Sequence, residues 1–147
     1  MASYAENRKV RFDYEILEKF ECGIELIGTE VKAIRGGQMS LEGSFVIVRG
    51  GEAYLMNANI PPYQVANAPK DYDPLRNRKL LLTKKEIAEL GDSGKNKSLT
   101  IVPISVYNKG RKIKVEIALV KGKKKFDKRE TIKKRETDRE VRREYKR

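Results

Sequence analysis

The residues best able to do chemistry in this sequence are lysines and arginines gathered in four clusters. Their charged side chains bind phosphate groups, and neutralising several phosphates releases counterions and so gains affinity. One cluster alone is more often a solvated surface, the interpretation we give to Lys84-Lys85. Four clusters together favour nucleic acid as the partner. The clusters are Arg76, Arg78 and Lys79; Lys109, Arg111, Lys112 and Lys114; Lys121 to Lys125; and Lys128 with Arg129.

Residues suited to catalysis are scarce. The sequence has no His, which removes the commonest general base and the commonest metal ligand. One Cys cannot form a zinc site. Asp71 and Asp73 are typical turn residues and too few for a metal-dependent nuclease. The sequence therefore predicts a binding protein, not an enzyme, without a metal or other cofactor. Because exposed aromatic residues are few, recognition of folded RNA is favoured over single strands.

The positive charge is concentrated at the C-terminal end. Residues 121–147 hold 14 Lys and Arg against 6 Asp and Glu, out of a net charge of +12 for the chain. An anionic membrane would also attract this arm, but the arm lacks the apolar face of an interfacial helix. The single Cys, with no apolar leader and no long apolar run, predicts a cytoplasmic protein without a membrane partner.

Alternating apolar and polar residues predict the elements that must position these clusters. We expect a mainly β fold, a small six-stranded antiparallel barrel of oligonucleotide-binding type with two or three short helices. Residues 1–120 form the barrel, and residues 121–147 form a basic tail that is disordered when free and helical against a partner. Gly23 predicts a bend or bulge, and Cys22 a core residue. The expected strands are 12–27, 45–49, 52–60, 75–82, 99–107 and 111–120; the expected helices are 28–37, capped by Thr29, and 83–90, opened by a Thr83–Glu86 capping box.

Particular motifs in this sequence resemble those of the bacterial small protein B family, the SsrA-binding proteins. The resemblance runs in consistent order from about residue 7 to residue 135. It rests on Asn7-Arg8-Lys9, Tyr14-Glu15-Ile16-Leu17-Glu18, Phe20-Glu21, Gly28-Thr29-Glu30-Val31-Lys32, the run from Asp73 to Leu82, the run from Lys114 to Ala118, Gly122-Lys123-Lys124 and Asp127-Lys128-Arg129.

The resemblance implies an RNA-binding adaptor for ribosome rescue by trans-translation. Such a protein binds the tRNA-like domain of transfer-messenger RNA and delivers it to stalled ribosomes. There its tail probes the empty mRNA channel near the decoding centre and the 16S rRNA. The resemblance further implies a monomer and leaves open an indirect association with elongation factor Tu.

The resemblance also implies which residues do this work. Carried over position by position, it assigns RNA binding to Asn7, Tyr14, Glu21, Glu30, Lys32, Arg76, Arg78, Leu81 and Lys114. It assigns function on the ribosome to Gly122, Lys123, Lys124, Asp127, Lys128 and Arg129. A structural ribosomal protein with a basic tail remains the alternative, because its composition would be similar.

Overall fold

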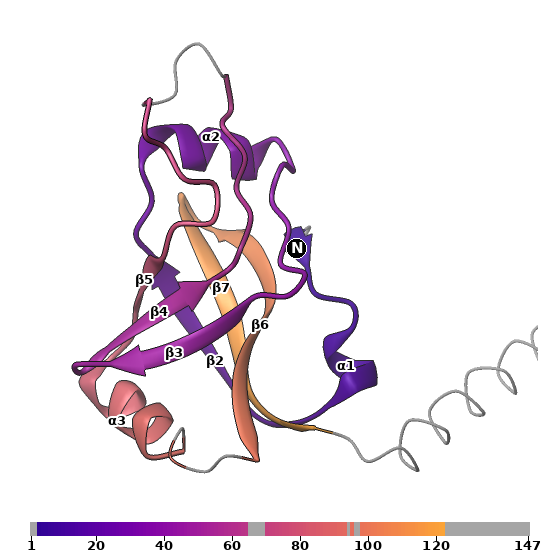
Figure 1. Ribbon diagram of the computed structural model, residues 1–147, viewed down its shortest axis with the longest axis vertical. Helices are drawn as coiled ribbons and strands as arrows, with labels where there is room; N and C mark the ends of the chain where they lie inside the picture. Colours follow the sequence, from indigo (N-terminus) through magenta and orange to yellow (C-terminus); the bar gives the residue numbers. More distant parts are fainter. Residues whose placement is uncertain (1–2, 65–69, 94, 96–97, 123–147) are drawn as a thin grey trace, which may run out of the picture.

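Strands dominate the protein, and they form one antiparallel sheet (Figure 1). The computed structural model describes residues 3–64, 70–93, 95 and 98–122. In chain order the elements are β1 (Ser3–Glu6), α1 (Val10–Asp13), β2 (Tyr14–Ile24), α2 (Gly28–Arg35), β3 (Phe45–Arg49), β4 (Glu52–Met56), β5 (Arg78–Leu81), α3 (Lys84–Ser93), β6 (Leu99–Lys109) and β7 (Lys112–Gly122).

The sheet closes on itself because β6 and β7 pair along their whole length. The order β6-β3-β4-β5-β2-β7 returns to β6, so the closed ring contains β2 to β7. This confirms the mainly β barrel. The sequence did not predict β1, which pairs with residues 105–107 of β6 and makes a seventh strand in the described part of the chain. Its four residues carry too short an alternation to stand out from the sequence alone.

The barrel interior is filled by the apolar parity of each strand. Val115 and Ile117 of β7 have no exposed surface, and neither does Leu55 of β4. The helix α2 closes one end of the barrel with Ala33 and Ile34, both fully buried, while α3 lies at the opposite end (Figure 1). Burying a side chain such as Ile34 stabilises the fold by roughly 1.5–3 kcal/mol relative to leaving it exposed.

The strand expected from residue 12 begins later, at Tyr14. Val10–Asp13 instead forms the short helix α1, which buries Val10. The register of β2 shifts between Ile16 and Glu18, and Leu17 is 48% exposed there. The irregularity in β2 therefore lies at Leu17. The prediction of a bulge at Gly23 was wrong, because Gly23 pairs in regular register with Leu81 on one side and Lys114 on the other.

The helix starts show one correct and one incorrect cap prediction. The backbone amide of Thr83 donates to Glu86, and the amide of Glu86 donates to Thr83 Oγ1 at 3.2 Å, as expected for a capping box. This helix continues to Ser93. At α2 the cap is Ile27 and not Thr29, and the Ile27 amide donates to Glu30 Oε1 at 3.0 Å.

Glycine sets the geometry of two hairpins, which join predicted strand 45–49 to 52–60 and predicted strand 99–107 to 111–120. Gly50 and Gly51 have φ of 60° and 76°, as the two central positions of a type I′ turn require. The second hairpin is tighter than expected, because Lys109 pairs with Lys112 and leaves Gly110 and Arg111 as a two-residue loop. The predicted domain boundary after residue 120 falls within β7, which continues to Gly122. The prediction for the tail concerns residues from 123 onward, outside the described residues.

Candidate nucleic-acid interface

Three residues predicted to bind RNA come together on the outer face of the barrel. Gly23 of β2 lies opposite Leu81 of β5 on one side and opposite Lys114 of β7 on the other. Lys114 in turn lies opposite Tyr107 of β6. Glu21 precedes Gly23 by two residues and therefore points to the same face. The closed sheet thus makes a continuous surface from segments that are far apart in sequence.

Gly23 leaves a notch in this surface. A Cβ atom at Gly23 would lie 3.2 Å from the Leu81 Cβ atom and 3.3 Å from its Cδ1 atom. Because glycine has no side chain, the Leu81 side chain lies directly over the backbone, and it is still 49% exposed. This close approach is the physical reason for a glycine within the strand.

A groove of about 340 Å³ opens beside the notch. Its apolar lining offers a surface for a base or a sugar, and its basic rim favours phosphate. Arg35 of α2 donates to the Arg111 carbonyl at 3.2 Å and so joins the helix to the β6–β7 turn at one edge of the groove. The apolar lining is Ile24, Leu26, Val31, Leu81 and Ile113, and the basic rim is Arg35, Arg111, Lys112 and Lys114.

The Glu21 carboxylate is held by two donors from β6. The Tyr107 hydroxyl donates to Glu21 Oε2, and Lys109 Nζ lies 2.9 Å from Oε1. These hydrogen bonds, from Tyr107 first and then Lys109, hold the pKa of Glu21 below its ordinary value of 4.5. Burial and the same hydrogen bond raise the pKa of Tyr107, so its hydroxyl keeps the donated proton. Near neutral pH the site therefore presents an ionised carboxylate beside Lys114.

The other half of the outer face of β2, β7 and β6 is covered. Val10 of α1 packs with Val102, Ala118 and Val120 in a small cluster, against which Tyr14 also packs. Tyr14 is consequently half-buried and lies opposite Gly122, where the described part of β7 ends. The predicted tail residues 123, 124 and 127–129 lie outside the described residues.

Asn7 lies at the far side of the same face. Its amide donates to the Ile104 carbonyl at 2.7 Å, just after β1. With Ser105 and Glu116 it lines a further cleft of about 430 Å³. Asn7 therefore lies on the same outer face as Glu21, close to the part of that face that α1 covers.

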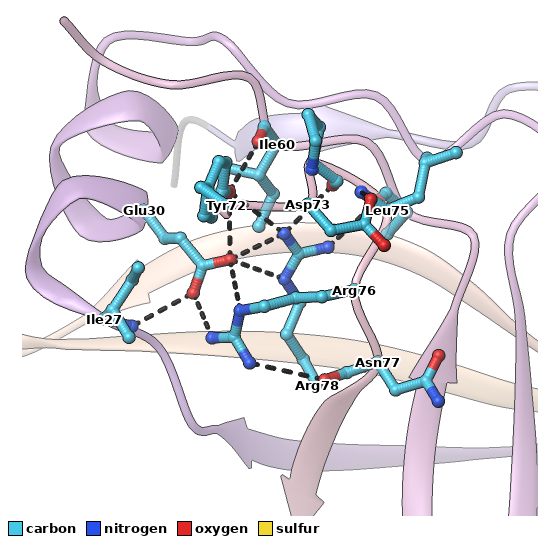
Figure 2. Close-up of polar contacts among 11 residues, drawn as sticks. Ile27, Glu30, Ile60, Tyr72, Asp73, Leu75, Arg76, Asn77 and Arg78 are labelled. Carbon is cyan, nitrogen blue, oxygen red and sulfur yellow. Dashed lines mark hydrogen bonds and ion pairs between the residues drawn. The ribbon is translucent and has the colours of Figure 1, made fainter. Parts of the chain in front are cut away.

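Glu30, Arg76 and Arg78 form a separate network inside the molecule (Figure 2). Arg78 donates to Glu30 Oε2 from Nε at 2.8 Å and from Nη2 at 2.6 Å, and both side chains have no exposed surface. Arg76 binds the same carboxylate, its Nε donating to Oε2 at 3.0 Å. The Tyr72 hydroxyl lies 3.1 Å from Glu30 Oε2. Every face of this carboxylate is occupied by a donor from the protein itself.

The network places Glu30 and Arg78, both predicted to bind RNA, inside the protein and away from the groove. Both side chains are buried, and Arg78 also donates to the Ala58 and Pro74 carbonyls at 2.7 and 3.0 Å. Burial raises the pKa of Glu30, but hydrogen bonds from Arg76, the Ile27 amide and Arg78 outweigh it and leave the pKa below 4.5. The network joins the start of α2 to β5 and to the segment before it. It positions the helix that lines the groove.

The remaining predicted residues are divided between the two regions. Lys32 is exposed on α2, and Arg76 is partly exposed at the edge of the internal network. Lys79, from the first predicted basic cluster, forms an ion pair with Glu52 at 2.8 Å. That cluster is therefore not a free cationic surface. The cluster at residues 109–114 is the one that the structure places beside Glu21 and the groove.

Sequence reasoning missed Tyr107 and the role of Gly23. The alternation of β6 does put Ser105, Tyr107 and Lys109 on one parity, but the loop expected at residues 108–110 would have placed Tyr107 opposite Arg111 and not opposite Lys114. The sequence signal was therefore the parity of Tyr107 alone. Contact with Glu21 could not be found from it, because Glu21 lies 86 residues away from Tyr107.

Other chemical sites are few among the residues described. No group of three or more His, Cys, Asp or Glu that could hold a metal ion occurs in residues 3–64, 70–93, 95 and 98–122. Within the same ranges no helix is long and apolar enough to cross a membrane. Cys22 is a buried core residue as predicted, its thiol donates to the Val115 carbonyl at 3.2 Å, and burial raises its pKa to about 12.

The chain is similar to known proteins in both sequence and structure. The family model described as "SmpB protein" matches residues 4–147. The SsrA-binding protein of Latilactobacillus sakei is 53% identical over 137 residues, covering 93% of this chain and 87% of its own. That of Thermosynechococcus vestitus is 49% identical over 142 residues, covering 97% and 93%. A solved structure described as "tmRNA-SmpB: a journey to the center of the bacterial ribosome" contains a chain with 46% identity and a TM-score of 0.68, covering 82% of this chain and 84% of that one.

Proposed function

This chain belongs to the SmpB protein family, and from that premise we propose that it is an RNA-binding adaptor of trans-translation. It binds the tRNA-like domain of transfer-messenger RNA and delivers this RNA to stalled ribosomes. Its relatives are SsrA-binding proteins, and the similar solved chain belongs to a tmRNA-SmpB structure concerned with the bacterial ribosome. It acts in the cytoplasm, where ribosomes are, as a monomer and without catalysis of its own.

The observation that carries this proposal is the meeting of Glu21, Leu81 and Lys114 beside one groove. Gly23 brings Leu81 and Lys114 to its two sides, and Glu21 lies two residues along the same strand. Each offers a different contact. Lys114 binds phosphate, the exposed Leu81 packs on a sugar or base, and Glu21 accepts hydrogen bonds from base amino groups or 2′-hydroxyls.

A carboxylate at this position gives selectivity that lysines alone would lack. Phosphate contacts carry no information about the shape or edges of the RNA, whereas an acceptor must meet a correctly placed donor. A purely basic face would bind many RNAs in a strongly salt-dependent way. The mixed site therefore fits recognition of one folded RNA.

The tail residues Gly122, Lys123, Lys124, Asp127, Lys128 and Arg129 act in the second step, on the ribosome. They contact the 16S rRNA near the decoding centre and in the empty mRNA channel. The charge distribution supports this role, because residues 121–147 have 14 Lys and Arg. Any association with elongation factor Tu would be indirect.

The test of the adaptor function is competition binding. Purified protein is titrated against the tRNA-like domain, with an ordinary tRNA and a generic hairpin as competitors, at two salt concentrations. Preference for the tRNA-like domain that survives the higher salt is expected. Equal and steeply salt-sensitive binding to all three RNAs would contradict the proposal and favour a structural ribosomal protein.

A pair of variants separates the two steps. We expect Glu21→Ala to weaken binding of the tRNA-like domain. We expect Asp127→Ala to leave that affinity intact and abolish tagging of stalled nascent chains in a reconstituted translation reaction. An equal loss of RNA affinity in both variants would contradict this division between barrel and tail.

A further inference from the structure

Tyr107 and Lys109 donate hydrogen bonds to the Glu21 carboxylate but do not use all of its acceptor positions. Each donor approaches a different oxygen of the carboxylate, the hydroxyl at Oε2 and the ammonium at Oε1. An ionised carboxylate offers about four acceptor positions. With the donors that the described residues supply, two positions are left for a ligand, and the side chain remains 37% exposed. Glu21 is fixed in direction and still open to an incoming donor.

The two donors differ in how firmly they hold the carboxylate. Lys109 lies next to the turn, and its side chain is 58% exposed on a flexible four-carbon stem. Tyr107 lies within β6, pairs with Lys114 of β7 and is half-buried. Its ring has only two rotatable bonds, so it holds its hydroxyl in place at low entropic cost. Tyr107 is the rigid constraint on Glu21.

We propose that Tyr107 is a positioning residue for RNA recognition, which holds the Glu21 carboxylate beside Lys114 so that it accepts donors of the tRNA-like domain. This inference rests on the proposed function and adds a residue to it. Without the hydroxyl, Glu21 would sample other rotamers in water. Binding would then have to order the side chain as well as form the contact.

The first experiment tests the contact without RNA. Side-chain carboxyl NMR signals of the free protein are followed as the pH is lowered, for the wild type and for Tyr107→Phe. The charged groups facing Glu21 are Lys109 of β6 and Lys114 and Glu116 of β7, and Tyr107→Phe keeps all three. The Glu21 pKa is expected to be below 4.5 in the wild type and higher in Tyr107→Phe. An unchanged Glu21 pKa in Tyr107→Phe would overturn the contact.

The second experiment measures the affinity for the tRNA-like domain in a double-mutant cycle. Tyr107→Phe is expected to weaken binding about fivefold to tenfold in the wild-type background and by less than about twofold in Glu21→Ala, which has no acceptor for Tyr107 to position. A merely structural role would give the same loss in both backgrounds. Thermal unfolding of each variant checks that the barrel remains folded.

The chain offers a matched control in a second trio of the same residue types. The Tyr54 hydroxyl donates to Glu52, and Lys79 pairs with Glu52 at 2.8 Å on β4 and β5. Tyr54→Phe therefore removes the same atom from the same kind of trio. Its RNA affinity is expected to equal that of the wild type, and a loss equal to that of Tyr107→Phe would overturn the specific role of Tyr107.

Failure of this inference and failure of the adaptor function give different results. If the wild type shows no preference for the tRNA-like domain, the adaptor function is wrong and the RNA role of Tyr107 falls with it. If the wild type keeps its preference and Tyr107→Phe binds equally well, only the positioning role is wrong. Additive losses for Tyr107→Phe and Glu21→Ala would likewise overturn it.

Discussion

Glu21 on β2 and Glu30 on α2 each lie beside a tyrosine hydroxyl and cationic side chains, but they differ in solvent exposure. Glu21 accepts from Tyr107 and Lys109 and keeps 37% of its side chain exposed. Glu30 accepts from Arg76, Arg78 and a backbone amide and has no exposed surface. The difference shows that residue type alone does not make a carboxylate a binding group. An acceptor contributes to recognition only where the fold leaves part of it unoccupied.

The largest expected effect of this difference is on stability. Glu30→Ala would leave the Arg78 guanidinium buried without its anion, which costs about 3–5 kcal/mol of unfolding free energy. Glu21→Ala changes an exposed group and should leave the unfolding midpoint close to that of the wild type. Urea unfolding of the two variants measures the contrast. Equal destabilisation would show that the two carboxylates are not functionally separated.

Acid should weaken the buried network specifically. The folded-state pKa of Glu30 is below its ordinary value of 4.5, so its stabilising contribution is fully present above pH 4.5. The contribution is lost as the pH falls through the folded-state pKa, because the unfolded chain binds the proton more readily. The difference in unfolding free energy between the wild type and Glu30→Gln should therefore shrink as the pH falls below about 4. Other carboxylates affect both proteins alike, so a difference independent of pH would contradict this account.

Two leucines of equal exposure can test whether the notch at Gly23 contacts RNA. Leu81 is 49% exposed above the Gly23 notch, and Leu17 is 48% exposed at the register shift of β2. We expect Leu81→Ala to weaken binding of the tRNA-like domain about fivefold to tenfold, since its apolar contact with RNA is lost. Leu17→Ala should have no such effect, and neither variant should unfold more easily. Equal affinities for the two variants in a filter-binding titration would argue against an RNA contact at the notch.

The smallest expected effect is a change in salt dependence. Lys114 lies beside the notch, whereas Lys84 starts α3 at the opposite end of the barrel from α2 (Figure 1). Lys114→Gln should reduce the slope of log affinity against log salt by about 1, as loss of one phosphate contact requires. Lys84→Gln should leave the slope unchanged. The same slope in both variants would place the phosphate contacts elsewhere.

The β barrel could be predicted from the sequence, because long alternating runs such as the one from Lys112 to Val120 fit only half-buried strands. Local rules also predicted the Thr83–Glu86 capping box and the two strands on either side of Gly50-Gly51. These features depend on residues that are close in sequence. Boundaries such as the start of β2 at Tyr14 were less accurate, since the packing of Val10 onto Ala118 and Val120 decided them.

Which charged residues are available for binding could not be predicted from the sequence, because it depends on long-range contacts in the folded protein. Glu21 and Glu30 look alike in the sequence, and Arg76, Arg78 and Lys79 look like a basic surface cluster. Their environments depend on partners 27 to 88 residues away, such as Arg78 for Glu30 and Lys109 for Glu21, together with the burial that the closed barrel imposes. Burial and long-range pairing are set by the closed fold as a whole, and no local pattern of residues records them.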